Sequence, residues 1–405
     1  MTTGADTSTP GPASDEGFVQ RIRANISAGN LGSWPVVIGL IIIVLFFSLK
    51  ADNFFTPGNF TNILTQMAGV TMLAYGVVFV LLIGEIDLSI SYVSGIAGVV
   101  VAQLTLAGSS HAIPGILAIA AAIGVCALIG LFQGSIVALI GVPAFVVTLA
   151  GFQIWQGVIQ KSIPQGVLSI QDNTVNNVAN YFFSEKAGWA MAIVVSAVYV
   201  ASTVAGIVSR RRHGVAIRNP VMVVLKLVGI VGASFIVVAI CNKDRGVPFV
   251  LLLIVAMLLL WTFVAKRTTF GRHVYAVGGN AEAARRSGIN VPRVRIIVFM
   301  ISSGMAGLGG VVLAARLSSV DLNAGGGTLL IDAIAAAVIG GVSLFGGRGE
   351  VRDALFGSLV IATIANGLNT LNLTQGTIYI VTGSILLLAV TLDTILRRRQ
   401  KKAGR

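Results

Sequence analysis

The chain has 405 residues, of which 55% are hydrophobic and only 11% are charged, and its mean hydropathy is +0.90. Soluble domains carry about 25% charged residues, so this composition excludes an ordinary soluble protein and predicts a polytopic membrane protein. The formal net charge of +13 does not indicate nucleic-acid binding, because the basic residues lie between and beyond the apolar stretches.

The two ends of the chain differ from the apolar middle. Residues 1–33 are rich in Ser, Thr, Gly and Pro and lack the basic start and apolar core of a cleaved signal peptide, so we expect a disordered cytoplasmic tail. Residues 397–405 form a short basic cytoplasmic tail. Residues 34–396 are predicted to be one transmembrane domain.

The transmembrane domain is predicted from apolar stretches, each near the length of about 17 to 25 residues that a helix needs to cross a bilayer. They predict an all-α transmembrane helical bundle of about 10–12 spans, with broken or re-entrant helices among the shortest. The stretches lie at residues 34–49, 61–83, 90–107, 114–140, 143–160, 187–209, 220–241, 249–265, 296–316, 329–346, 354–371 and 377–396.

The distribution of basic residues predicts the orientation. Most of the 28 lysines and arginines lie in the two tails and in the loops at 210–218 and 266–295. Because cytoplasmic loops carry the excess of Lys and Arg, both termini and these loops are predicted to be cytoplasmic.

The first polar interruption of the apolar pattern, at residues 84–89 (GEIDLS), contains Glu85, Asp87 and Ser89. A carboxylate at bilayer depth costs about 2.5 to 3.5 kcal/mol, so these acids need water, a partner or an interfacial position. Two interpretations stand: a solvated cytoplasmic turn, or a broken helix along a transport path.

A second interruption, at residues 340–350 (GGVSLFGGRGE), lies in the other half of the chain. Paired interruptions in corresponding halves are typical of a site between two structural repeats. With 48 glycines in the chain, the same pattern also arises without any repeat.

The sequence contains no motif for catalysis or for a metal site. It has no Walker A loop and no G-x-S-x-G elbow, and its three histidines are scattered. Cys126 and Cys241 lie in apolar stretches and are predicted to be buried thiols. We therefore predict no metal, no cofactor bound by this chain and no enzymatic activity.

The long polar loop at 266–295 has the signals of a two-turn helix. Asn280 is a suitable N-cap, Glu282 lies in the first turn, and Gly288 suits the left-handed cap. A helix this short is marginal alone, which favours a docking surface for a partner. The alternative is a basic patch that only sets the topology.

Several of these segments resemble a known family. Glu282, Ala283 and Ala284, followed after three residues by Gly288, resemble the coupling-loop motif of ABC importer permeases. Residues 84–89, 271–280 (GRHVYAVGGN) and 287–290 (SGIN) resemble the signature of the ribose, xylose and galactose permease group. The resemblance covers residues 34–396 and leaves the N-terminal tail unexplained.

This resemblance implies the membrane-spanning permease subunit of an ATP-driven sugar importer in the bacterial plasma (inner) membrane. ATP and Mg would be used by separate ABC ATPase subunits, and an extracellular binding protein would deliver the sugar. A second permease copy and membrane lipid would complete the set of partners, with no nucleic acid. The insertion at 210–212 and the extra apolar stretches at 220–265 resemble the longer D-xylose permeases, which makes a pentose the expected cargo.

The resemblance also implies roles for particular residues. The residues expected to couple the chain to the ATPase are Arg272, Asn280, Glu282, Ala283, Ala284 and Gly288. The residues expected along the substrate pathway are Glu85, Asp87, Ser89, Gln66, Gln103 and Asn366. For the amides among them, hydrogen bonding between helices is the alternative role.

Two other classes of protein stay open at this point. A secondary carrier coupled to protons through Glu85 and Asp87 would explain the acids but not the capped loop helix. An integral-membrane enzyme would need clustered acids or histidines, and both are scattered in this chain.

Overall fold

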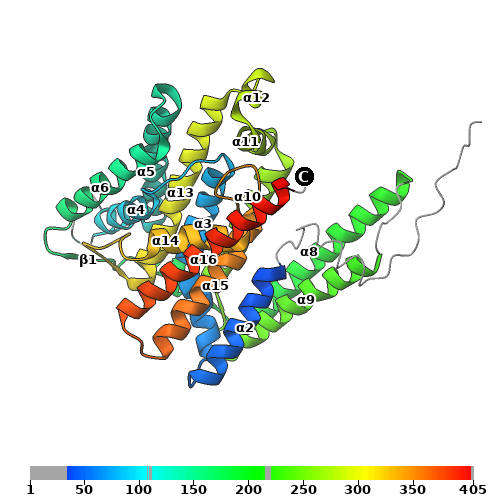
Figure 1. Cartoon of the computed structure of the whole chain (residues 1–405). Coiled ribbons are helices and arrows are strands. Elements are labelled where there is room, and N and C mark those ends of the chain that lie inside the picture. Colours follow the sequence, from blue (N-terminus) through cyan, green and yellow to red (C-terminus); the bar gives the residue numbers. More distant parts are fainter. Residues whose placement is uncertain (1–33, 107, 109–111, 215–219, 403–405) are drawn as a thin grey trace, which may run out of the picture.

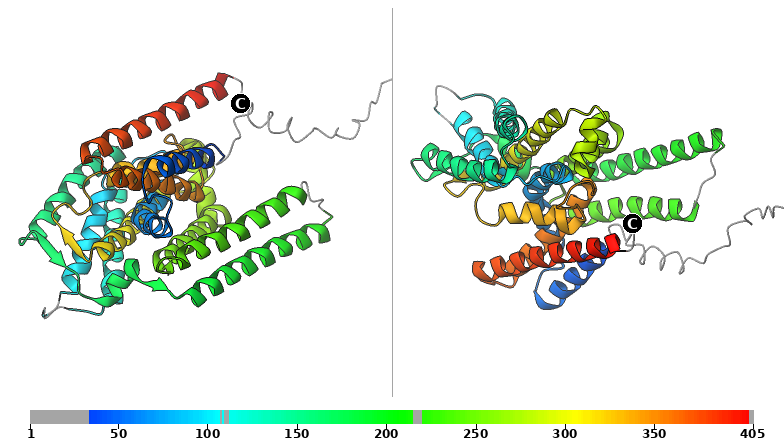
Figure 2. Two further views of the ribbon diagram at one scale, coloured as in Figure 1. Left: turned by 90° about the horizontal axis from the view of Figure 1, so that it is seen from below. Right: turned by 45° about the horizontal axis from the view of Figure 1, so that its top comes forward.

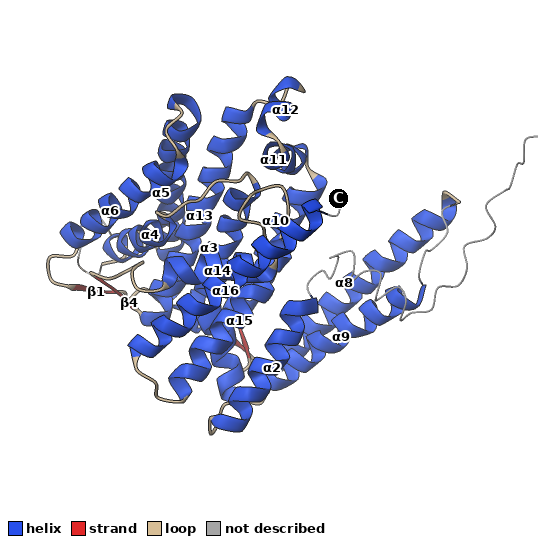
Figure 3. Ribbon diagram, viewed as in Figure 1, coloured by secondary structure: helices blue, strands red, loops and turns tan. Residues whose placement is uncertain are grey.

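The computed structural model describes residues 34–106, 108, 112–214 and 220–402. The predicted N-terminal tail and residues 403–405 lie outside the described residues. Almost all of the described chain is helical (Figure 3), which confirms the all-α prediction. The helices are α2 (Trp34–Lys50), α3 (Pro57–Leu82), α4 (Ile90–Leu104), α5 (Gly115–Ser135), α6 (Ala144–Ser162), α7 (Asn173–Asn180), α8 (Glu185–Arg212), α9 (Pro220–Asn242), α10 (Phe249–Arg267), α11 (Thr269–Gly279), α12 (Ala281–Arg286), α13 (Val291–Leu317), α14 (Leu329–Gly340), α15 (Val351–Thr370) and α16 (Gln375–Lys402).

Seven of the described helices are long and apolar enough to cross a membrane, counting α5 together with the π-helix Ile136–Ile140 that extends it. Four shorter apolar helices or helical segments, in α2, α4, α14 and α16, accompany them. A membrane span needs about 20 apolar residues, so the 15 residues of α4 and the 12 of α14 are too short to cross alone.

Helix α13 lies at the centre of the bundle, against α3, α4 and α5 (Figures 1 and 2). Glycines make this packing close. A side chain on Gly130 of α5 would collide with the carbonyl oxygen of Phe299, and one on Gly310 of α13 would collide with that of Ser94. Small residues serve this purpose in membranes, where no hydrophobic effect drives helices together.

Helices α8 and α9 form a hairpin that projects from the bundle (Figure 1). They contact each other, and the hydroxyl groups of Ser196 and Ser234 lie 3.0 Å apart between them. Most of the apolar surface of both helices is exposed.

Two short sheets lie at the end of the bundle where α13 finishes. Strand β1 (Val167–Ser169) pairs antiparallel with β4 (Ser319–Asp321), and β2 (Phe182–Phe183) pairs antiparallel with β3 (Val247–Pro248). Helix α7 begins nearby, where the carboxylate of Asp172 accepts a hydrogen bond from the amide of Val175.

Helices α14 and α15 form a tight hairpin. A side chain on Gly340 would collide with the carbonyl oxygen of Asp353, and one on Gly357 would collide with that of Ala336. The apolar stretch predicted to reach residue 346 ends as a helix at Gly340. Residues 341–350 form a loop instead, because its four glycines, at 341, 346, 347 and 349, all have positive φ angles.

Candidate functional site

Asp87 lies in the segment between α3 and α4 and is buried, with only 3% of its surface exposed. The amide and hydroxyl of Ser89 donate hydrogen bonds to Oδ1 of Asp87 over 3.0 and 2.7 Å. The hydroxyl of Ser302 in α13 donates to Oδ2 over 3.2 Å. Both oxygens of the carboxyl group therefore have hydrogen-bond partners inside the protein, as a buried polar group requires.

Gln133 of α5 extends this network. Its Oε1 lies 2.9 Å from the hydroxyl oxygen of Ser89, and its Nε2 has no hydrogen-bond partner. The hydroxyl of Ser89 has one proton and cannot donate to Asp87 and Gln133 at the same time. With the amide turned over, Gln133 donates to Ser89 and Ser89 donates to Asp87.

Glu85, the other acid of this segment, pairs with Arg295 near the start of α13, where Oε1 and Nη2 are 3.2 Å apart. The hydroxyl of Thr148 in α6 lies 3.3 Å from the carbonyl oxygen of Ile86. The structure thus matches neither interpretation of the segment in full. Protein encloses Asp87 and Ser89, which a solvated turn would leave in water, whereas Gly84 and Ile86 of the same segment are exposed.

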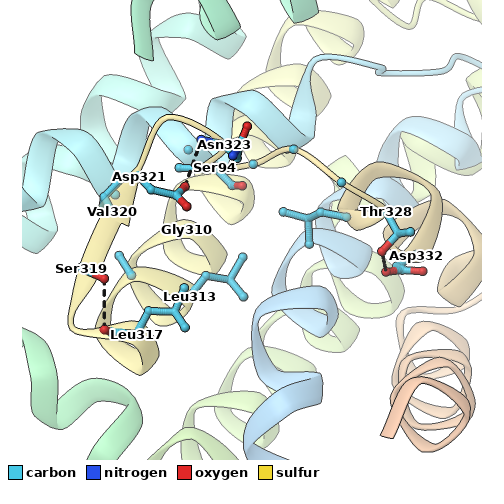
Figure 4. A pocket seen from close by; sticks show the side chains of 18 of the residues that line it. Ser94, Gly310, Leu313, Leu317, Ser319, Val320, Asp321, Asn323, Thr328 and Asp332 are labelled. Atoms are coloured by element: carbon cyan, nitrogen blue, oxygen red, sulfur yellow. Dashed lines mark hydrogen bonds between the residues drawn. The ribbon is translucent and has the colours of Figure 1, made fainter. Parts of the chain in front are cut away.

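A cavity of about 440 Å³ lies beside the middle of α4, at Ser94, Gly95 and Gly98 (Figure 4). Its walls come from α4, α13, the segment after β4, and the first turns of α14 and α16. The volume lies within the range of about 300 to 1,000 Å³ that is typical of small-molecule sites. The polar residues that line it are Ser94, Ser319, Asp321, Asn323, Thr328, Asp332, Gln375 and Tyr379.

Two carboxylates are held in place at this cavity. Thr328 donates to Oδ2 of Asp332 over 2.7 Å, and the amide of Asn323 donates to Oδ1 of Asp321 over 3.0 Å (Figure 4). A carboxylate accepts several hydrogen bonds, so each acid keeps capacity for the hydroxyl groups of a solute. With Tyr379 at the rim, the cavity combines apolar walls with a few fixed polar groups.

The six residues predicted for the substrate pathway do not line this cavity. Glu85, Asp87 and Ser89 lie before the first turn of α4. Gln103 donates to the carbonyl oxygen of Ser162 over 3.0 Å, Gln66 is half-buried on α3, and Asn366 is buried in α15. Their role in transport stays a prediction.

Sequence reasoning missed the cavity residues. Asp332 is the one with a visible signal, because it is an acid within the apolar stretch 329–346. Asp321 and Asn323 lie between two apolar stretches and have the composition of an ordinary loop. Only the fold shows that this loop turns back over α4, where a side chain on Gly95 would collide with the carbonyl oxygen of Ala324.

The predicted loop helix is present as α12, with the expected caps. The side chain of Asn280 accepts a hydrogen bond from the amide of Ala283 over 2.9 Å, and Gly288 has a φ of 84°. Glu282 is paired with Arg285 at 2.8 Å and Arg286 at 3.1 Å, and their hydrogen bonds lower its pKa. Helix α12 stands out at one end of the bundle (Figure 1).

The same loop is attached to the bundle by α11. The hydroxyl of Tyr275 donates to the carbonyl oxygen of Gly349 over 2.7 Å, and Lys266, at the end of α10, pairs with Glu350 at 2.6 Å. Burial and the charges of Glu350 and Asp353 raise the pKa of Tyr275 to about 12, so the hydroxyl keeps its proton at neutral pH. Arg272, another residue of the predicted coupling set, is exposed on α11.

Three glycine-containing segments meet at this attachment. The amide of Gly347 donates to the carbonyl oxygen of Leu82, at the end of α3, over 2.9 Å. A side chain on Gly278, in the last turn of α11, would collide with that oxygen. The polar interruptions at 84–89 and 340–350, which lie in opposite halves of the sequence, are therefore neighbours in space.

The described residues contain no group of three His, Cys, Asp or Glu side chains that would hold a metal ion. Cys126 and Cys241 are both buried, as predicted. The described residues thus combine apolar helices, a small cavity with a few polar groups and a separately capped loop.

The family follows from the sequence. The family described as "Branched-chain amino acid transport system / permease component" matches residues 59–390, so the chain belongs to this family of permeases. It is a multi-pass inner-membrane protein. No solved structure matches the chain significantly.

Three relatives are similar over almost the whole chain. The xylose transport system permease protein of Haemophilus influenzae is 34% identical over 374 residues, which cover 90% of this chain and 96% of that protein. The protein of the same name from Escherichia coli K12 is 35% identical over 377 residues, covering 91% and 93%. The ribose import permease protein of Escherichia coli K12 is 31% identical over 360 residues, covering 88% and 92%.

Proposed function

We propose that this chain is the membrane-spanning permease subunit of an ATP-driven sugar importer, and that its cargo is a pentose such as D-xylose. One observation carries the proposal: the relatives similar over about nine-tenths of the chain are named for the transport of xylose and of ribose. A separate binding protein outside the membrane delivers the sugar.

The chemistry of the cavity supports a sugar as the cargo. A sugar presents several hydroxyl groups on a small ring, each of which donates and accepts hydrogen bonds. Carboxylates at Asp321 and Asp332 accept such bonds, the amides of Asn323 and Gln375 do both, and the ring of Tyr379 offers an apolar face. We assign this cavity to the sugar path.

The energy for transport comes from separate ATPase subunits that use ATP and Mg. Helix α12 is the element of this chain that those subunits bind. ATP moves the permease between two states only if the ATPase binds those states with different free energies. A proton-coupled carrier would use Glu85 and Asp87 to carry protons. In this protein both have internal partners instead: Glu85 is paired with Arg295, and Asp87 is hydrogen-bonded to Ser89 and Ser302.

The distribution of Lys and Arg supports an orientation with both termini and α12 in the cytoplasm. Two copies of the chain then enclose a continuous path, and lipid covers the exposed apolar faces of α8 and α9. We expect no nucleic acid among the partners of the chain.

The test is uptake by vesicles that contain this chain, its ATPase and its binding protein. We expect ATP-dependent accumulation of labelled D-xylose, and weaker competition from unlabelled ribose and allose than from unlabelled xylose. Accumulation of none of the three sugars by the complete complex would overturn the proposal.

A further inference from the structure

Between the loop helix α12 and the sugar cavity lies an unbroken series of contacts. It begins at α11, which joins α12 through Asn280. It continues through the hydrogen bond from Tyr275 to Gly349, and it ends at the cavity through α14. Tyr275 lies within the family motif at 271–280, but it is not among the residues expected from the sequence to couple the subunits.

The bond of Tyr275 reaches the start of α15. Its acceptor, Gly349, directly precedes Glu350, the N-cap of that helix. The amide of Glu350 donates to the carboxylate of Asp353 over 2.7 Å, and the side chain of Glu350 caps the helix in return. A displacement of α11 is therefore passed to a rigid, reciprocally capped helix end.

From the start of α15 the displacement passes to α14. The two helices touch backbone to backbone at Gly340 and Gly357, where no side chain intervenes. The carbonyl oxygens of Asp353 and Ala336 fill the space that a Cβ would take. Close packing of this kind transmits a shift instead of absorbing it.

Helix α14 carries the shift to the cavity. Its 12 residues correspond to a rigid rod of about 18 Å. One end lies at the loop that Tyr275 holds, and the other end supplies Leu329 and Asp332 to the cavity wall. A tilt at the first end changes the shape of the cavity at the second.

We propose that Tyr275 is the positioning residue through which the ATPase controls the cavity: its bond to Gly349 makes α11, α14 and α15 move together. This inference rests on the proposed function. The ion pair between Lys266 and Glu350 assists, but it is partly exposed and contributes less.

The test uses the complete complex of permease, ATPase and binding protein in nanodiscs, with a reporter at the cavity. Leu329→Cys places a thiol at the first residue of α14, and the native Cys126 and Cys241 are buried and stay silent. The rate at which a polar maleimide labels this introduced thiol is measured with and without a non-hydrolysable ATP analogue. We expect the analogue to change the labelling rate in the complex that carries Leu329→Cys alone.

Tyr275→Phe, added to Leu329→Cys, removes only the donor of the bond. In this variant we expect the nucleotide-induced change in labelling to be lost, and the sugar transported per ATP hydrolysed to fall about fivefold, the effect of one lost hydrogen bond. The ATPase still copurifies with the permease. Lys266→Gln should give a smaller loss, and Tyr181→Phe, at the opposite end of the bundle, should change neither quantity.

Two results would refute the role of Tyr275, and a third would refute the proposed function. A nucleotide-induced change in labelling that is undiminished by Tyr275→Phe would refute the inference and leave the proposed function intact. Loss of ATPase binding would also refute it, because Tyr275 would then belong to the docking surface. If the complex without substitutions takes up no sugar, the proposed function itself fails.

Discussion

The hydroxyl of Ser302, in the middle of α13, donates to Oδ2 of Asp87 over 3.2 Å. This bond joins the irregular segment between α3 and α4 to the central helix of the bundle. Asp87 is thereby part of the internal framework of the protein, and both oxygens of its carboxyl group have hydrogen-bond partners on serine residues.

Ser302→Ala leaves one oxygen of the buried carboxylate without its donor. We expect a cost of about 1 to 3 kcal/mol, seen as a lower temperature of unfolding in detergent. Ser303→Ala is the matched control, because Ser303 is equally buried but its hydroxyl has no hydrogen-bond partner. Equal changes in the two variants would show that the bond to Asp87 contributes nothing.

Gly278→Ala tests the meeting of α11 with α3. The added methyl group would collide with the carbonyl oxygen of Leu82 and lie 2.8 Å from the amide nitrogen of Gly347. Because backbone atoms cannot yield as a flexible side chain does, we expect α11 to be displaced and sugar uptake to fall at least tenfold.

The neighbouring residue supplies the control for this substitution. A methyl group added to Gly279, in the same helix, would meet no atom within 4 Å, so Gly279→Ala should leave uptake unchanged. Initial uptake rates, corrected for the amount of protein in the membrane, provide the comparison. Equal rates in both variants would remove the argument from close contact.

Substitutions of Gly288 test the C-terminal cap of α12. Its φ of 84° is the left-handed conformation, which costs a residue with a side chain about 1 to 2 kcal/mol and is least accessible to β-branched residues. A methyl group there meets no atom within 4 Å, so the effect of a substitution is purely conformational.

We therefore expect Gly288→Val to lower sugar uptake relative to ATP hydrolysis, whereas Gly288→Asn, which tolerates this conformation, should keep the two coupled. The ratio of the two rates in vesicles is the measurement. A value for the valine variant equal to that of the asparagine variant would mean that the cap has no part in coupling.

Substitutions of Asp332 and Gln66 distinguish the sugar path through the cavity from the path that the sequence suggested. Asp332→Asn weakens a charged hydrogen-bond acceptor in the cavity, and we expect the sugar concentration for half-maximal transport to rise about tenfold. Gln66→Ala alters a residue that the sequence suggested but that lies away from the cavity. If only the glutamine variant changes this concentration, the cavity is not on the path.

The length of the apolar stretches and the capping residues made much of the fold predictable. The helix at 281–286 followed from Asn280 and Gly288 because these caps act locally. The end of α14 was misplaced by six residues, because residues 341–346 (GVSLFG) are apolar enough to continue a span. Hydropathy does not register the positive φ angles of Gly341 and Gly346, which end the helix.

The site was less predictable, for a reason that lies in the fold. Glu85 and Asp87 are conspicuous in the sequence because acids are expensive in a membrane, yet the structure satisfies them with partners more than 200 residues away, Arg295 and Ser302. The cavity residues are conspicuous only in three dimensions, where the loop after β4 closes over α4.

Vesicles that contain the permease alone, or the permease with its ATPase and binding protein, provide the most direct test of the central claim. The account predicts that labelled D-xylose accumulates only in the second kind and only with ATP, and that an imposed proton gradient moves none in the first. Accumulation by the permease alone in response to that gradient would contradict it.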